Sequence, residues 1–466
     1  MKENKYNWNY LLGLSIVSAM GGLLFGYDYV VIGGAKPFYE PFFGITESAF
    51  LQGWTMSCAL IGCLGGAIIS GWLSDRFGRK KLLILAAGLF IAASLGTGSS
   101  NTLSAFIFFR IIGGAGIGLA STMSPMYIAE ISPGDVRGRF VSINQLTIVT
   151  GILAAQLINW RIARPVPAGA TINDIMASWN GQVGWRWMFY ACTVPAALFF
   201  ILMWFIPESP RWLAKNSVNH SKVLKILSKI GGSDFADREL KSINETLNSD
   251  QQDSGLMIIR QHGISKILVL GIVLAVFQQW CGINVIFNYA QEIFSGAGYS
   301  VSDILFNIVI TGSVNLIFTF VGMLTVDRLG RKALMLMGAG GLAGIFAIVG
   351  AMYFFHVQGL PLLIMVVSAI ACYAMSLAPV TWVVLSEIFP NRIRGIAMSF
   401  ATFALWTACF VLTYTFPLLN KMLNASGTFW LYGLICASGY WFILKKLPET
   451  KGKSLEEIEH VFVKLV

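Results

Sequence analysis

Long apolar stretches without alternation dominate the chain. Residues 82–96, 191–206 and 362–377 are almost entirely apolar. A membrane-spanning helix needs about 20 mostly apolar residues, whereas a membrane β-strand needs about 10 residues that alternate in polarity. The stretches do not alternate, so they predict helices. Twelve spans are predicted, over residues 10–34, 52–74, 82–99, 103–128, 140–163, 185–206, 264–294, 303–326, 333–355, 361–386, 396–420 and 427–446.

The composition points to the same class of protein. Hydrophobic residues make up 56% of the 466 residues and charged residues only 12%. A soluble domain carries roughly 25% charged residues, so this chain cannot cover a water-facing surface with charge. We therefore expect an all-α membrane protein and exclude soluble globular and disordered classes.

The positive charge lies mainly in the loops on one side of the membrane rather than in one patch. One set of loops and span ends carries eleven basic residues: Arg76, Arg79, Lys80, Lys81, Arg137, Arg139, Arg328, Arg331, Lys332, Arg392 and Arg394. The alternate set carries five: Lys36, Arg161, Arg164, Arg186 and Lys421. Basic loops stay in the cytoplasm. This predicts a multi-pass protein of the cytoplasmic (inner) membrane with both termini cytoplasmic, and it argues against nucleic-acid binding despite a net charge of +10.

Cysteine and histidine show no pattern of a metal, haem or catalytic site. All seven cysteines fall inside predicted spans, and the four histidines are scattered. The cysteines are expected to pack as small apolar residues. We expect no metal, no cofactor and no enzymatic activity.

The chain repeats itself. Asp75 and Asp327 stand 252 positions apart in matching Asp-Arg-x-Gly-Arg-Lys motifs, and Glu130 and Glu387 stand 257 apart in a second matching pair. Pro-Glu motifs at 207–208 and 448–449 form a third. Repeats of this kind build transporters from two pseudo-symmetric six-helix halves, with substrate held between them near the midplane. The expected division is 1–206, a linker at 207–266, 267–450, and a cytoplasmic C-terminal helix at 451–466.

The linker is the one long hydrophilic stretch. Val223, Ile226, Leu227 and Ile230 recur at helical spacing, as do Ala236, Leu240, Ile243 and Leu247 in a second set. The pattern predicts short amphipathic helices on the cytoplasmic face. Packing explains them more simply than regulation does.

Acidic and basic residues recur together at the cytoplasmic ends of the spans. Anchoring of the topology requires the arginines alone, so the acids need another explanation. We expect an ion-pair network that joins the inner faces of the two halves and breaks when the protein changes state. This charge latch comprises Asp75, Arg79, Glu130, Arg137, Glu208, Asp327, Arg331, Glu387, Arg394 and Glu449.

Polar residues inside the spans are the candidate functional groups. Asp28 and Arg110 both lie within predicted spans, and because a lone charge is costly there, each is expected to pair with the other. The amides Gln278, Gln279 and Asn284 cluster in span seven. Amides both donate and accept hydrogen bonds, and indole rings cover apolar faces, so the set suits a neutral polyhydroxylated ligand. The alternative is hydrogen bonding between helices.

Several motifs together resemble the sugar-porter branch of the major facilitator superfamily, closest to bacterial xylose–proton symporters. They are Gly71-x-x-x-Asp75-Arg76-x-Gly78-Arg79-Lys80, Pro207-Glu208-Ser209-Pro210-Arg211-Trp212-Leu213, Gln278-Gln279-x-x-Gly282-Ile283-Asn284 and Pro448-Glu449-Thr450-Lys451-Gly452. The resemblance runs from about Phe25 to Glu457 and implies the major facilitator fold.

The resemblance also implies roles for individual residues. Sugar contacts would fall on Phe25, Gln145, Gln278, Gln279, Asn284, Asn315 and Trp382, with Trp406 as a nearby wall. Asp28 would couple the proton and Arg110 would be its partner. Three positions depart from the family: Asn288 replaces a tyrosine and adds a polar group to the expected site, Ala378 replaces a glycine, and Leu405 replaces an amide.

The predicted function is proton-coupled uptake of a neutral monosaccharide, a pentose such as xylose or a hexose, by alternating access. The partners are the sugar, the proton and the lipid bilayer, and the protein is expected to act as a monomer. One alternative is a facilitative uniporter, in which Asp28 only holds Arg110. A second alternative is a non-transporting sugar sensor, which the short C-terminal tail disfavours.

Overall fold

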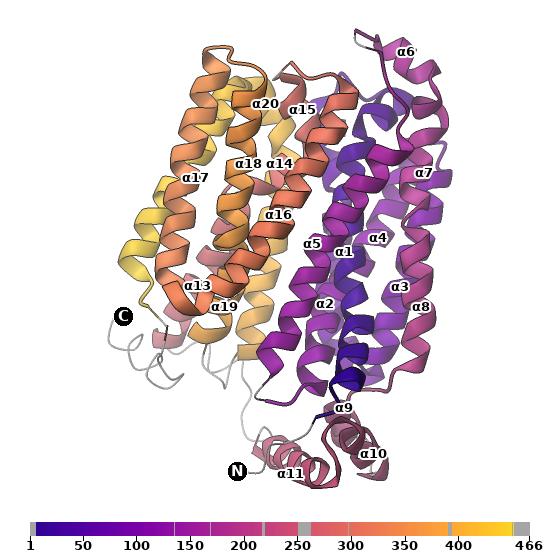
Figure 1. The fold of residues 1–466 in the computed structure, drawn as a ribbon, viewed down its shortest axis with the longest axis vertical. Helices are drawn as coiled ribbons and strands as arrows, with labels where there is room; N and C mark the ends of the chain where they lie inside the picture. Colours follow the sequence, from indigo (N-terminus) through magenta and orange to yellow (C-terminus); the bar gives the residue numbers. More distant parts are fainter. Residues whose placement is uncertain are drawn as a thin grey trace.

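The computed structural model describes residues 6–134, 136–167, 169–216, 220–249, 262–296, 298–389, 394–449 and 451. Within these residues the secondary structure is helical and contains no strand. The helices form one upright bundle, with a small helical group outside one end (Figure 1). We call the end beside this group the linker end and the opposite end the far end.

The N-terminal half supplies the first six crossings. They are α1 (Trp8–Phe43), α2 (Ala49–Phe77), α3 (Arg79–Ser99), α4 (Leu103–Ile131), α5 (Arg137–Ile162) and a sixth built from the π-helix η1 (Asn180–Gly184), α7 (Trp185–Tyr190) and α8 (Thr193–Phe205). A short helix, α6 (Ile172–Ala177), lies at the far end (Figure 1).

The C-terminal half supplies the other six. They are α13 (His262–Trp280) continued by α14 (Ile283–Asn288) and α15 (Ala290–Gly296), α16 (Val301–Leu329), α17 (Arg331–Phe354), α18 (Leu360–Met375) continued by α19 (Leu377–Ile388), and α20 (Arg394–Lys446). The 53 residues of α20 are broken at Asn424, whose φ is 56° and ψ 176°. A helix of that length would run about 80 Å at 1.5 Å per residue, against an apolar bilayer core of about 30 Å. It therefore crosses twice.

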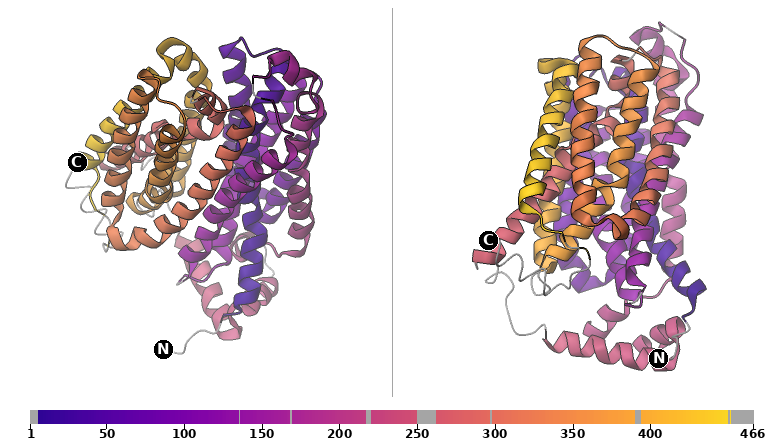
Figure 2. Two further views of the ribbon diagram at one scale, coloured as in Figure 1. Left: turned by 45° about the horizontal axis from the view of Figure 1, so that its top comes forward. Right: turned by 60° about the vertical axis from the view of Figure 1, so that its left-hand side comes forward.

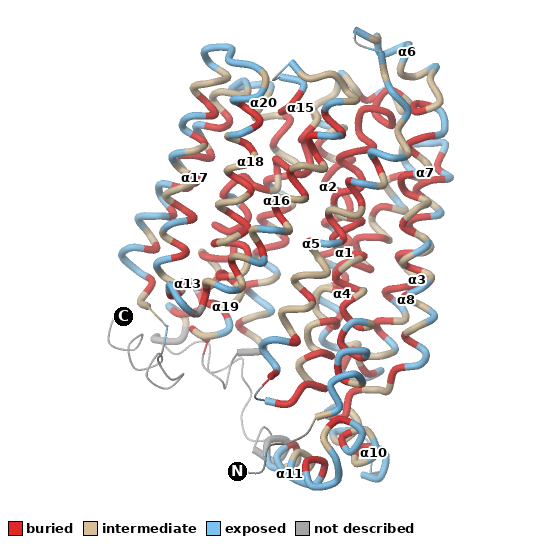
Figure 3. Tube along the Cα trace, viewed as in Figure 1, coloured by how far each residue is buried: buried red, intermediate tan, exposed pale blue. Residues whose placement is uncertain are grey.

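Eleven described helical segments are long and apolar enough to span a membrane, and the last of them, Ile396–Lys446, accounts for two crossings. The predicted all-α fold with twelve spans is thereby confirmed. Buried residues line the inside of the bundle and exposed ones its outside (Figure 3). Large apolar side chains such as Phe205, 80% exposed, and Leu324, 72% exposed, face outward, as lipid contact requires.

Glycines bring helices of one half into direct backbone contact. A Cβ on Gly114 of α4 would lie 1.8 Å from the carbonyl oxygen of Ala59 on α2, and one on Gly62 would lie 2.0 Å from that of Ile111. No larger residue fits at such a crossing. These contacts pack α2 and α4 of the N-terminal half tightly against each other.

The linker folds as the sequence predicts, into α9 (Pro210–Asn216), α10 (His220–Gly231) and α11 (Ser233–Ser249). Val223, Leu227 and Ile230 of α10 are buried against Ala236 and Ile243 of α11, and Ile226 and Leu240 are partly buried against them. The side chain of Leu247 and the predicted C-terminal helix after residue 451 lie outside the described residues.

Two predicted spans of the C-terminal half are not continuous helices. The span predicted over 264–294 breaks at Gly282, whose φ is 87°, and again at Tyr289. The span predicted over 361–386 breaks at Ser376, three residues before Pro379. Left-handed backbone at glycine explains the break at Gly282, and the amide donor that Pro379 lacks explains the break at Ser376. Broken helices at midplane are typical of transporter binding sites.

The first helix also differs from its prediction, which ended at residue 34. α1 continues to Phe43 and ends at Gly44 with φ 66°. The sequence-based boundary stopped before Lys36 and Glu40 because charged residues are costly in a membrane. In the structure these two side chains pair one turn apart, with 3.2 Å between Nζ and Oε1.

The described hydrogen bonds and ring contacts between the halves lie at midplane or toward the far end. α2 meets α20 through Phe50 and Tyr414, whose rings are 5.9 Å apart, and the amide of Val166 donates to Ser302 Oγ over 3.0 Å. Toward the linker end the two halves diverge (Figures 1 and 2). The bundle is therefore sealed at its far end.

Candidate functional site

A buried ion pair lies inside the N-terminal half. Arg110 Nη1 of α4 lies 2.8 Å from Asp28 Oδ1 of α1, and Arg110 Nη2 donates to the backbone oxygen of Asp28 over 3.2 Å. Both side chains are less than 5% exposed. Asp28 Oδ2 and Arg110 Nε have no described hydrogen-bond partner. The structure thus brings together the two charges that the sequence paired.

Three amides meet where the seventh crossing breaks. Gln278 Nε2 donates to Tyr373 Oη over 2.8 Å, and Gln279 Nε2 donates to Gln278 Oε1 over 2.6 Å. Asn284 Nδ2, just past the break at Gly282, donates to Gln279 Oε1. The break allows Asn284, on one side of it, to donate to Gln279 on the other side. The result is an uncharged row of donors and acceptors.

The row continues across the boundary between the halves. Asn284 Nδ2 lies 3.9 Å from Cys409 Sγ of α20, and Cys409 Sγ lies 3.4 Å from Tyr29 Oη of α1. Asn288 Nδ2 donates to the same Tyr29 Oη over 3.1 Å. Tyr29 directly follows Asp28, so the amide row ends beside the buried ion pair.

A small cavity separates these groups. It has a volume of about 10 Å³ and is lined by Tyr29, Asn288 and Arg110, with apolar residues of α2 and α4. That is about the space of one water molecule. The ion pair and the amide row are therefore neighbours with room for a single small polar bridge.

Aromatic rings from both halves lie beside the amides. The rings of Phe25 on α1 and Trp406 on α20 are 5.6 Å apart and tilted by 56°. Trp382 is partly buried on α19, and Asn315 is buried on α16. Gln145 is partly buried on α5, and among the described residues no hydrogen bond joins it to the amides of the other half.

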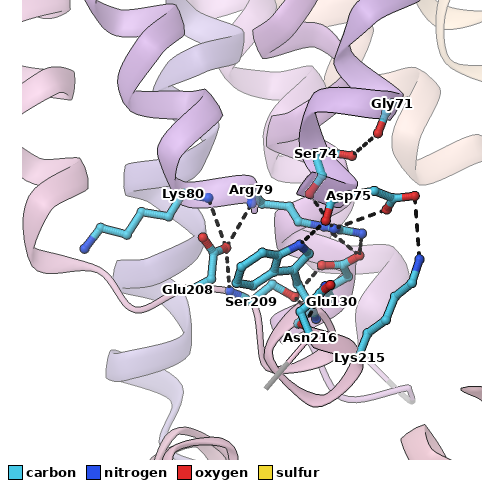
Figure 4. Close-up of polar contacts among 11 residues, drawn as sticks. Gly71, Ser74, Asp75, Arg79, Lys80, Glu130, Glu208, Ser209, Lys215 and Asn216 are labelled. Carbon is cyan, nitrogen blue, oxygen red and sulfur yellow. Dashed lines mark hydrogen bonds and ion pairs between the residues drawn. The ribbon is translucent and has the colours of Figure 1, made fainter. Parts of the chain in front are cut away.

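A second set of charges lies at the linker end of the N-terminal half (Figure 4). Arg79 donates to Glu130 Oε1 from Nε over 3.1 Å and from Nη2 over 2.8 Å. Glu208 Oε1 accepts the backbone amides of Arg79, Lys80 and Ser209 at 2.9, 3.1 and 2.9 Å. Glu208 thereby caps the N-terminus of α3, where the helix dipole favours a carboxylate.

The C-terminal half repeats this geometry. Arg331 donates to Glu387 Oε1 from Nε over 3.1 Å and from Nη2 over 2.9 Å. Glu449 accepts the backbone amides of Arg331 and Lys332 at 2.9 and 3.0 Å. The repeat detected in the sequence is thus a repeat of hydrogen-bond geometry.

The charge latch between the halves stays a prediction. The described ion pairs of its members lie within a half or join Asp75 to Lys215 of the linker, and none of them joins the two halves. Glu130 pairs with Arg79 rather than with Arg137, which is exposed at the start of α5. The side chains of Asp327 and Arg394 lie outside the described residues.

Sequence reasoning missed three site residues, Tyr29, Tyr373 and Cys409. A single tyrosine or cysteine in an apolar span is indistinguishable from a packing residue. It also missed a charge cluster at the far end, where Lys36 Nζ reaches Glu292 Oε1 of α15 as well as Glu40. The signal for that cluster was present, since Lys36 and Glu40 stand four residues apart on one helix.

The arrangement suits a neutral ligand rich in hydroxyl groups. The amide row offers donors and acceptors without net charge, and the two aromatic rings offer flat apolar surfaces. The nearby charges are already paired with each other. An anionic ligand would meet no uncompensated cation in this row.

Comparisons with known proteins agree with this geometry. Residues 14–462 match the family model described as "Sugar (and other) transporter". The chain is 38% identical to the D-xylose-proton symporter of Escherichia coli, over 98% of this chain and 96% of that one. It is 37% identical to the arabinose-proton symporter of Bacillus subtilis, over the same shares.

A solved structure has the same fold. The inward-open conformation of the xylose transporter XylE from E. coli superposes with a TM-score of 0.83 at 36% identity, over 97% of this chain and 100% of that one. The resemblance drawn from the sequence motifs is confirmed. The chain belongs to the sugar-transporter family of the major facilitator superfamily.

Proposed function

We propose that the protein carries a neutral monosaccharide, a pentose or a hexose, into the cell together with a proton. The observation that carries the proposal is the hydrogen-bonded row that begins at Tyr373 and ends at Tyr29, the residue after Asp28. It supports a single connected site in which a sugar-binding surface adjoins a proton-binding carboxylate.

The sugar lies between the halves. Gln278, Gln279 and Asn284 bind its hydroxyls, and Phe25 and Trp406 cover its ring from opposite halves. Gln145, Asn288, Asn315 and Trp382 complete the wall. Because these groups come from both halves, a bound sugar favours the state in which the halves close around it.

The proton binds Asp28. A proton on its carboxylate cancels the negative charge, and the attraction that holds Arg110 is lost. Arg110 then seeks another acceptor, and the small cavity shared with Tyr29 and Asn288 gives it access to the sugar site. Loss of the proton on the opposite side of the membrane restores the pair and resets the cycle.

The linker end faces the cytoplasm, with both termini on that side of the inner membrane, and the protein acts as a monomer. Residues 1–206 and 267–450 move as the two bodies of an alternating-access transporter, with 207–266 between them. The divergence of the halves at the linker end and the similarity to an inward-open structure support an inward-facing state. The charge clusters at this end hold each half rigid while it moves.

The test is a transport assay in proteoliposomes with a panel of pentoses and hexoses. A symporter accumulates its sugar against a gradient when a proton gradient is imposed, and sugar addition alkalinises the outer medium. Sugar uptake without alkalinisation would identify a uniporter. Sugar binding without any uptake would identify a sensor, and no binding by any sugar of the panel would refute the proposal.

A further inference from the structure

The far end of the bundle contains a buried charge cluster that spans the two halves. Lys36 of α1 is 2% exposed at its side chain, and its Nζ contacts Glu292 Oε1 of α15. The same Nζ lies 3.2 Å from Glu40 Oε1 and 5.2 Å from the centre of the Tyr289 ring. A lysine held this far from water needs a carboxylate partner.

The two carboxylates belong to different halves. Glu40 lies on the same helix as Lys36, one turn away, and its Oε2 is 3.5 Å from Gln52 Nε2 of α2. Glu292 is held by the C-terminal half. The backbone oxygen of the next residue, Ile293, accepts a hydrogen bond from Tyr353 Oη of α17 over 2.6 Å. Of the two described ion pairs of Lys36, the one with Glu292, the far-end pair, connects the halves.

The backbones are close beneath this pair. A Cβ on Gly33 of α1 would lie 3.0 Å from the carbonyl oxygen of Phe287 on α14. The first helix therefore packs directly against the broken seventh crossing, and the far-end pair lies over that contact. Opening of the far end must separate Lys36 from Glu292.

We propose that Lys36 and Glu292 are positioning residues of the transport cycle, which hold the far end shut in the state described here. The pair exists only when the far end is closed. In the open state both groups meet water, where an ion pair contributes little. The pair therefore biases the equilibrium between the two states without touching sugar or proton.

The proposal predicts how strongly each of three variants favours opening of the far end. Glu292→Gln removes the far-end pair but leaves Lys36 with Glu40. Lys36→Met strands both carboxylates in the closed state and favours opening more strongly. Glu40→Gln is the matched control, because it removes the other carboxylate partner of Lys36 while the pair between the halves survives.

Hydrogen–deuterium exchange of the full chain in lipid nanodiscs, in the absence of sugar, measures amide exchange rates at both ends of the bundle. In Glu292→Gln we expect amides of residues 283–296 to exchange about tenfold faster, in proportion to the open population. Amides of residues 137–144, at the linker end of α5, are expected to exchange more slowly as that end closes. Lys36→Met should show larger changes, and Glu40→Gln should match the wild type.

Three outcomes would overturn the proposal: exchange in Glu292→Gln equal to the wild type, faster exchange at both ends, which indicates simple loosening, or an equal response in Glu40→Gln. The proposal rests on the alternating access of the proposed function. The exchange assay does not require transport. Its result can therefore be interpreted even if no transported sugar is found.

Discussion

Tyr29 and Asn288 form a hydrogen bond across the boundary between the two halves, with 3.1 Å between Oη and Nδ2. Tyr29 stands next to Asp28 on α1, and Asn288 ends α14, the short helix that carries the amide Asn284. In the proposed transport cycle, movement of α14 around a sugar is transmitted through this bond to the helix that holds Asp28. The contact joins two residues that stand 259 positions apart in the sequence.

Tyr29→Phe removes this contact with little change of volume. A buried hydrogen bond contributes about 1 kcal/mol, so the equilibrium between the two states should shift roughly fivefold toward the one open at the far end. The apparent sugar affinity measured from the two sides of oriented vesicles should shift in opposite directions.

Tyr27→Phe is the control for that variant. Its hydroxyl donates to the backbone oxygen of Met188 over 3.3 Å, within the N-terminal half. It loses a hydrogen bond of the same kind but should leave the ratio of the two affinities unchanged. Equal ratios in both variants would contradict a role for the Tyr29 contact.

Gln278→Ala should weaken sugar binding. The change removes one ligand group, strands the hydroxyl of Tyr373 and takes away the acceptor of Gln279. A stranded buried polar group costs about 1–3 kcal/mol, so the Kd should rise roughly 5- to 150-fold. Calorimetric titration of the purified protein measures this. Gln182→Ala, at an exposed position of η1, should bind the sugar as the wild type does.

Much of this architecture could be predicted from the sequence. Membrane helices are long apolar stretches, and the constant offset between the repeated motifs predicts two halves. Asp28 and Arg110 could be paired because two opposite charges buried in a membrane have few other partners. The fold and the main polar groups were therefore accessible.

Other features depend on tertiary contacts that leave no local pattern. The helix breaks at Gly282 and Ser376 depend on backbone geometry at single residues. The extension of α1 through Lys36 and Glu40 depends on a partner, Glu292, that lies 256 positions from Lys36. The division of the charge latch into two separate clusters depends on the conformational state, which no sequence specifies.

Asp28→Asn should separate sugar movement from proton movement. The amide has the shape of the carboxylate but carries no charge and takes no proton, so Arg110 is permanently released. We expect no accumulation of sugar against a gradient, while exchange of labelled for unlabelled sugar continues. Asp174→Asn, an exposed change on α6, should accumulate sugar normally. Concentrative uptake by Asp28→Asn would remove the carboxylate from the coupling step.

Glu130→Gln and Glu387→Gln should have matching effects, because the two clusters have matching geometry. In each, an arginine donates twice to one carboxylate oxygen, at 3.1 and 2.8 Å in one half and at 3.1 and 2.9 Å in the other. Loss of such charged hydrogen bonds costs about 2 kcal/mol, so both variants should unfold at lower temperature and transport more slowly at unchanged sugar affinity. Thermal unfolding in detergent and initial uptake rates measure these effects.

Lys215→Gln is the control. Its contact with Asp75 is 3.6 Å long and both side chains are more than half exposed, so the contact contributes little to stability. If only one of the two glutamate variants slowed transport, the two clusters would not serve equivalent roles in their halves.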